Sequence, residues 1–131
     1  MKITNFFLAI VMLTLLYSCS SGSDDNPSAN SRVVKYELTG TYSAPLQVIY
    51  TNEDGVTQSI DDVTLPWSKE VTVKAGVVTV GLSSSFQTVD ATMAGRTLTG
   101  KIFVGGLEKK SSSVIANSSG AIVLSALVHA L

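Results

Sequence analysis

The sequence predicts an all-β fold, and two observations lead to this prediction. From Val33 onward the apolar residues mostly recur at every second position, which is the period of a half-buried strand. Turn-forming residues separate these segments at short intervals, and no stretch of the body carries an apolar stripe of helical period. Short strands at this spacing favour a small antiparallel, Ig-like β-sandwich of about seven or eight strands.

Length and composition limit the remaining possibilities. The chain has 131 residues, of which 45% are hydrophobic and 15% charged, and this suits one compact domain. A single Cys and a single His can form neither an intrachain disulfide nor a Cys/His metal cage. The net charge is -1, and no basic cluster is longer than Lys109-Lys110, so the chain lacks the positive surface that nucleic acid requires. We expect no metal, no other cofactor and no nucleic-acid partner.

Residues 1–18 have the order of residues typical of a secretory signal. Lys2 precedes an apolar run from Phe6 to Leu16, which is shorter than the roughly 20 residues of a membrane span. Leu16-Tyr17-Ser18-Cys19 then resembles a lipobox, which predicts that Cys19 becomes the mature N-terminus and carries acyl chains such as palmitate. An ordinary signal peptide with a free Cys and an uncleaved anchor are the alternatives. Both alternatives also keep the domain outside the cytoplasm.

Residues 19–32 are predicted to be the lipidated N-terminus and a flexible tether, because Ser20 to Ser31 contains nothing to bury. Asp24-Asp25 resembles the acidic signal that sends some lipoproteins to the outer face of the outer membrane. A solvated linker explains the same two residues. The predicted location is the extracytoplasmic side of a bacterial envelope, at the outer membrane rather than the inner one.

Residues 33–131 are predicted to form the sandwich. The apolar residues that alternate are Val34/Tyr36/Leu38, Leu46/Val48/Tyr50, Val71/Val73, Val78/Val80/Leu82 and Leu98/Ile102/Val104. Turn signals stand at 40–45, 52–55, 75–76, 94–95, 105–106 and 118–120. Because Gly55 can adopt a positive φ, the strand ending near Thr51 is expected to pair with the one beginning near Val56. The apolar run 121–131 could be a buried strand or a short helix, and we favour a last strand centred on 123–128.

Three ordered segments resemble the MmpS family of transport accessory proteins. They are Val34–Gly40, Ile49–Gly55 and Leu65–Lys69, and a later segment, Leu98–Gly106, looks like a further strand and turn of that family. The resemblance covers roughly residues 33–128 and implies a membrane-anchored β-sandwich, which in some members assists RND-type exporters of siderophores or lipids. The family usually has a Cys where Gly100 stands here, paired with another near the end of the last strand. It also uses a transmembrane helix as its anchor.

The most distinctive patch is Leu65-Pro66-Trp67-Ser68-Lys69, and Pro66, Trp67 and Lys69 are its candidate partner-binding residues. An RND-type transporter or another envelope protein is the partner that the resemblance implies. In the alternative interpretation, Trp67 fills the end of the sandwich while Pro66 blocks an edge strand.

Other polar residues give weaker signals. Glu53/Asp54 and Asp61/Asp62 lack the spacing of a Ca²⁺ loop, so they are interpreted as solvated turn carboxylates. His129 has no partner for metal binding or catalysis, and no nucleophile elbow occurs, so we expect no enzyme. The sequence thus predicts a non-catalytic, lipid-anchored accessory protein for membrane transport. A surface adhesion or structural lipoprotein that binds an extracellular ligand is the alternative.

Overall fold

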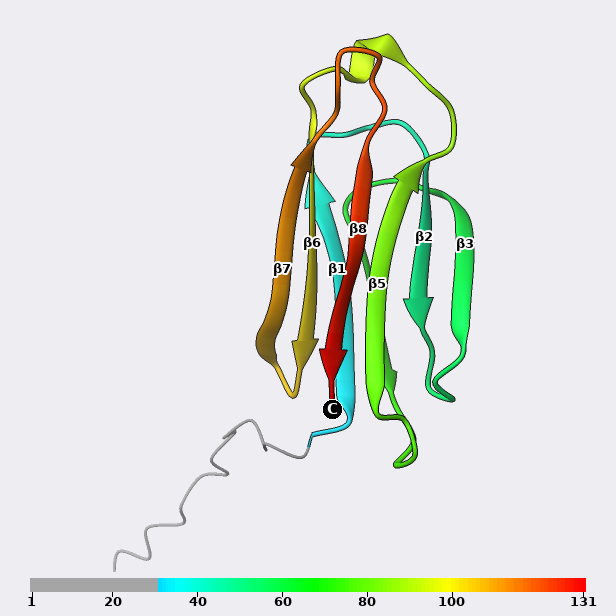
Figure 1. The fold of residues 1–131 in the computed structure, drawn as a ribbon, viewed down its shortest axis with the longest axis vertical. Helices are drawn as coiled ribbons and strands as arrows, with labels where there is room; N and C mark the ends of the chain where they lie inside the picture. Colours follow the sequence, from blue (N-terminus) through cyan, green and yellow to red (C-terminus); the bar gives the residue numbers. More distant parts are fainter. Residues whose placement is uncertain (1–30) are drawn as a thin grey trace, which may run out of the picture.

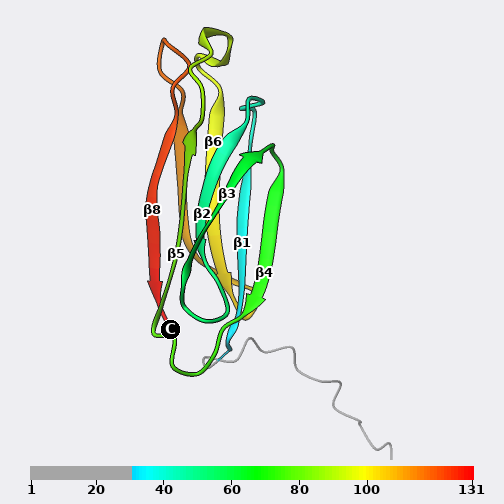
Figure 2. The same cartoon turned by 90° about the vertical axis from the view of Figure 1, so that its right-hand side faces the viewer.

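Two four-stranded antiparallel sheets pack face to face in the computed structural model, which describes residues 31–131 (Figures 1 and 2). The strands are β1 (Val33–Gly40), β2 (Leu46–Thr51), β3 (Thr57–Val63), β4 (Trp67–Thr72), β5 (Thr79–Phe86), β6 (Thr97–Val104), β7 (Leu107–Ile115) and β8 (Val123–Ala130), with a 3₁₀ turn, η1 (Ala91–Met93). The first sheet has the order β4-β1-β6-β7 and the second the order β3-β2-β5-β8. The predicted all-β sandwich of seven or eight strands is confirmed.

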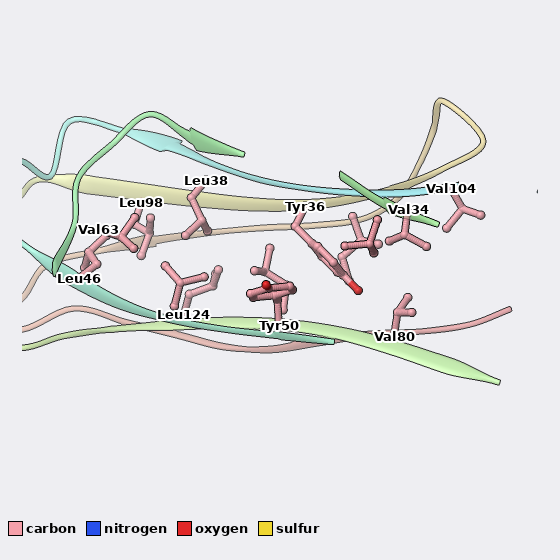
Figure 3. Packing of buried hydrophobic residues seen from close by; sticks show 14 of the residues in the cluster. Val34, Tyr36, Leu38, Leu46, Tyr50, Val63, Val80, Leu98, Val104 and Leu124 are labelled. Carbon is pink, nitrogen blue, oxygen red and sulfur yellow. The ribbon is translucent and has the colours of Figure 1, made fainter. Parts of the chain in front are cut away.

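The core lies between the two sheets and is built from the alternate residues of each strand. Val34, Tyr36 and Leu38 of β1 are fully buried, and β2 buries every second residue in the same way. Figure 3 shows these side chains meeting between the sheets. The one buried polar side chain within residues 31–131 is Ser84, whose hydroxyl donates to the carbonyl of Gln47 at 2.8 Å. Within residues 31–131, every buried polar side-chain atom therefore has a hydrogen-bond partner.

The hairpin predicted at residues 52–55 is confirmed. Thr51 pairs with Thr57, and the amide of Asn52 donates to the carbonyl of Val56 at 2.9 Å. The side-chain oxygen of Asn52 accepts from the amide of Val56 at 2.9 Å, which closes the turn from inside. Gly55 has φ 80°, the left-handed conformation that favours glycine.

The C-terminal apolar run forms strand β8, as favoured from the sequence, and pairs with β5. The strand is not fully buried, because Val123 and Val128 are exposed and its other face borders solvent. Val78 was predicted to face inward, and this prediction is wrong, because Val78 is 71% exposed while Val77 is buried. The amide of Val77 donates to the carbonyl of Lys74 at 3.0 Å, so the chain is still turning there. Strand β5 begins only at Thr79, and its inward residues start at Val80.

Gly100 lies on β6 at a close contact between the sheets. A Cβ atom at this position would collide with the Cδ2 atom of Leu124 and would lie 3.3 Å from Leu38 and 3.5 Å from Leu127. Leu124 and Leu127 belong to β8 of the other sheet. The absence of a side chain at Gly100 therefore lets leucines of both sheets pack directly over β6.

The two ends of the sandwich carry different loops (Figure 1). One end, called the entry end below, holds Ser31, the hairpin 52–56, the loop 73–78, the turn 105–106 and the C-terminal Leu131. The opposite end, called the far end, holds the connections 41–45, 64–66, 87–96 and 116–122. Because all strands run between these ends, a residue's position along its strand fixes its distance from each.

Candidate functional site

The segment Leu65–Lys69 carries the chain from one sheet to the other. Strand β3 ends at Val63 in the second sheet, and β4 begins at Trp67 in the first. The peptide bond between Leu65 and Pro66 is cis, and Pro66 is exposed. Trp67 is half-buried and packs against the core, whereas Lys69 is exposed. The structure thus places the three candidate residues together at the start of one edge strand.

Trp67 lies at the end of a row of three aromatic rings. The centroids of Tyr36 and Tyr50 are 5.5 Å apart, and those of Tyr50 and Trp67 are 6.0 Å apart, each pair tilted by 56°. Tyr50 comes from β2 of the second sheet, so it joins β1 to the edge strand across the interior. This row was not predicted from the sequence, although the alternation that places both tyrosines inward was a usable signal.

The inner ring of the row is held by a hydrogen bond. The hydroxyl of Tyr36 donates to the carbonyl of Thr51 at 2.7 Å. Burial raises the pKa of Tyr36 to about 12, so the hydroxyl stays protonated and remains a donor. The ring of Tyr36 is fully buried, which gives the row a fixed inner end and leaves Trp67 as its half-exposed outer end.

Strand β4 offers a free edge beside this row. It pairs with β1 on one side only, so its other side presents backbone groups that no strand of residues 31–131 uses. Lys69 shares a face with Trp67 and Val71 by alternation, yet it is exposed. An inward-facing charge is one way in which proteins protect an edge strand, and it also gives the patch a cation. A free strand edge, a half-exposed aromatic ring and an exposed cation thus lie together at this patch.

A second feature is a shallow depression at the entry end. It has a volume of about 320 Å³ and is lined by Asp54, Gly55 and residues 76–79. Asp54 forms an ion pair with Lys74, and their hydrogen bond raises the pKa of Lys74. The pair is exposed, so it contributes little to stability. The depression therefore offers one carboxylate that already has a partner.

The acidic pairs of the sequence are separated in the fold. Glu53 and Asp54 lie in the hairpin at the entry end, whereas Asp61 and Asp62 lie near the far end of β3. Asp61 accepts a hydrogen bond from Gln47 at 3.0 Å. In the part of the chain that the structure describes, no group of three or more His, Cys, Asp or Glu side chains could hold a metal ion. Cys19, the predicted lipidation site, lies outside the described residues.

His129 gives a testable pH dependence. Burial lowers its pKa below the ordinary value of 6.5, and the charges of Lys109 and Lys110 lower it further. Below pH 6.5 the unfolded chain therefore takes up this proton before the folded chain does, so stability falls as the pH falls. We expect urea midpoints to decrease between about pH 7 and pH 5, with a smaller decrease in His129→Gln. An identical decrease in that variant would assign the pH dependence to other groups.

The comparisons with known proteins bear on the family. The sequence model of a family described as Mycobacterium membrane protein matches residues 14–126, which is most of the chain. The search of curated proteins found no match. Among residues 31–131, no helix is long and apolar enough to cross a bilayer. The family description and the MmpS-like motifs agree, and both indicate a protein of the envelope that is associated with a membrane. The chain belongs to the MmpS-type Mycobacterium membrane protein family.

Proposed function

We propose that this protein is a non-catalytic envelope protein, held at a membrane by acyl chains on Cys19, that serves as an accessory subunit in membrane transport or export. The observation that carries the proposal is the family match over residues 14–126. The lipobox-like sequence Leu16–Cys19 supports the lipid anchor. The free edge of β4 and the half-exposed ring of Trp67 support a binding role.

The partner-binding surface in this proposal is the free edge of β4. An extended segment of a partner could add to its unpaired backbone, and the ring of Trp67 would then be an apolar anchor beside it. Lys69 favours a partner segment that carries a carboxylate. This gives Pro66, Trp67 and Lys69 a shared role at one interface.

The tether limits where the partner can be. Residues 20–31 would span only some 20 Å on average as a flexible chain. The domain is therefore held close to the lipid surface, and its partner is a membrane protein or a protein that lies on the membrane. An anchor in the inner membrane would bring an RND-type transporter within this reach, whereas an anchor in the outer membrane would require another envelope protein as the partner.

Loss of the anchor is expected to remove the partner as well. The test is a cross-linking pull-down of the full chain from its native envelope, with partners identified by mass spectrometry. The chain with Cys19 should recover transporter subunits, and Cys19→Ala should lose both membrane association and these subunits. Recovery of only abundant porins by the unaltered chain would contradict the accessory role. Recovery of an extracellular ligand instead would favour the adhesion role, which the surface-export resemblance of Asp24-Asp25 suggests.

The same pull-down locates the binding surface. Lys69→Glu reverses an exposed charge on the β4 edge, and Arg96→Glu makes the same change in charge at the far end. We expect recovery of the partner to fall in Lys69→Glu while the protein stays in the membrane fraction. Equal recovery from the two variants would place the interface elsewhere.

A further inference from the structure

The entry end is where the preceding chain joins the sandwich. Thirty residues precede Ser31, and they include the apolar run and Cys19. Arg32, the last residue before β1, is bound to the loop 73–78, because its Nε donates to the carbonyl of Val73 at 3.4 Å and the guanidinium also donates to the carbonyl of Val77. The chain therefore enters the domain beside this loop, at a fixed position.

The loop 73–78 and the hairpin 52–56 form one continuous rim. The amide of Lys74 donates to the carbonyl of Glu53 at 2.9 Å, and the side chains of Lys74 and Asp54 are paired. This rim presents Val56, which is 54% exposed, and Val78, which is 71% exposed. Two apolar side chains are thus held in water beside the point where the chain enters.

In the described part of the chain, five of the eight exposed large apolar residues lie toward the entry end: Val56, Val78, Val33, Leu107 and Val128. The other three, Val89, Ile115 and Val123, lie toward the far end. Leu107 follows the turn 105–106 on the exposed edge strand β7, and Glu108, Lys109 and Lys110 come after it. Glu108 forms an ion pair with Lys101. Apolar and basic side chains therefore occur together at the entry end.

Charge is distributed unevenly along the sandwich. Of the residues that the structure describes, the half nearer the entry end carries Arg32, Lys35, Lys69, Lys74, Lys109 and Lys110 against Glu53, Asp54, Glu70 and Glu108. Lys101 and Glu37 face each other at mid-height. The half nearer the far end carries Arg96 against Asp61, Asp62 and Asp90. The entry half is thus positive and the far half negative, a polarity that orients the domain in the field of an anionic surface.

We propose that the entry end is a membrane-docking surface, in which Val56, Val78 and Leu107 enter the headgroup region of an anionic lipid bilayer and Lys109 and Lys110, farther along β7, attract its phosphates. Apolar area and electrostatic attraction add in this kind of binding. In the lipid-anchored protein that we propose, the short tether would hold the entry end near the lipid, so the anchored chain would bind more tightly than the sandwich alone.

Docking in this way would stand the sandwich upright on the membrane. The strands then run along the membrane normal, and Trp67 lies five residues above the base of β4. At roughly 3.3 Å per residue, its ring would be held about 15–20 Å from the lipid surface. This height rests on the proposed function, since it gives the β4 edge a defined position for a membrane partner, whereas the docking itself needs only lipid.

Vesicle binding by a chain without an acyl group tests the docking alone. Residues 20–131 lack Cys19 but contain both sheets and the whole described core, so they retain everything that the sandwich buries. This chain should sediment with vesicles of phosphatidylcholine that contain about 30% phosphatidylglycerol, and much less with phosphatidylcholine alone. Added salt should weaken the binding. Equal binding to the two kinds of vesicle, or binding to neither, would overturn the proposal.

Two double variants with matched chemistry locate the surface. Val56→Asp/Val78→Asp changes exposed residues at the entry end, and Val89→Asp/Ile115→Asp makes the same change at the far end. The first should weaken vesicle binding about tenfold or more, and the second by less than about twofold. Unfolding curves of both variants would exclude a folding defect. Equal weakening of vesicle binding in the two double variants would contradict docking through the entry end. This outcome would leave the proposed transport partner untested, because that partner is detected by the pull-down from the native envelope.

Discussion

Gly120→Ala is expected to destabilise the domain by at least about 3 kcal/mol. Gly120 is buried and has φ 83°, which an L side chain rarely adopts. A Cβ atom there would overlap the backbone carbonyl oxygen of Asp90, and backbone cannot rotate away as a side chain can. The carbonyl of Gly120 also accepts from the buried hydroxyl of Tyr42 at 3.0 Å. Urea unfolding followed by circular dichroism measures the loss.

Gly95→Ala is the matched control. Gly95 also has a positive φ, 75°, but nothing lies within 4 Å of where its Cβ atom would be. This variant has only the backbone strain, which is about 1 kcal/mol. Similar losses in the two variants would show that the contact between residues 90 and 120 does not restrain the far end.

The parts of the fold that were predicted correctly follow from local physics. The alternation of Val34, Tyr36 and Leu38 predicts an inward face because the side-chain period of a strand is two. The hairpin at Asn52–Gly55 was predictable because its residues are the ones that such a turn requires. Both signals lie within a few residues of the structure that they predict.

The parts that were not predicted depend on contacts distant in sequence. Tyr42 and Gly120 are 78 positions apart, and the pairing of β1 with β6 skips four strands. Val78 was wrongly predicted to face inward, because which residues of β5 face inward depends on where the preceding turn ends. The turn still includes Val77, whose amide donates to the carbonyl of Lys74. Trp67 stood out as a rare residue type, but only the fold shows that Tyr50 reaches it from the other sheet. The sequence therefore identified Trp67 as a candidate residue, but it did not predict that Tyr50 lies beside it.

Tyr36→Ala is expected to cost about 3–5 kcal/mol, because it empties a fully buried ring position at the centre of the core. Tyr36→Phe keeps the ring and removes only the hydroxyl that donates to Thr51. That carbonyl then loses a hydrogen bond, which costs about 1–2 kcal/mol. Urea unfolding of the two variants separates the packing of the ring from its hydrogen bond. Equal losses would mean that the ring contributes nothing beyond its hydroxyl.

The same variants show whether the core positions the candidate binding edge. Trp67 is the only tryptophan of the chain, so its fluorescence reports on the start of β4 alone. Because Tyr50 lies between Tyr36 and Trp67, the cavity left by Tyr36→Ala should let Tyr50 shift and change the emission of the folded protein, whereas Tyr36→Phe should not. An unchanged emission in Tyr36→Ala would mean that Trp67 is positioned by the edge strand itself, and that partner binding at this edge does not depend on the aromatic row.

The free energy of unfolding should also fall as the pH rises from 10 toward 12, because the unfolded chain loses the proton of Tyr36 at a lower pH than the folded chain does. Urea unfolding across this pH range should show a smaller fall in Tyr36→Phe.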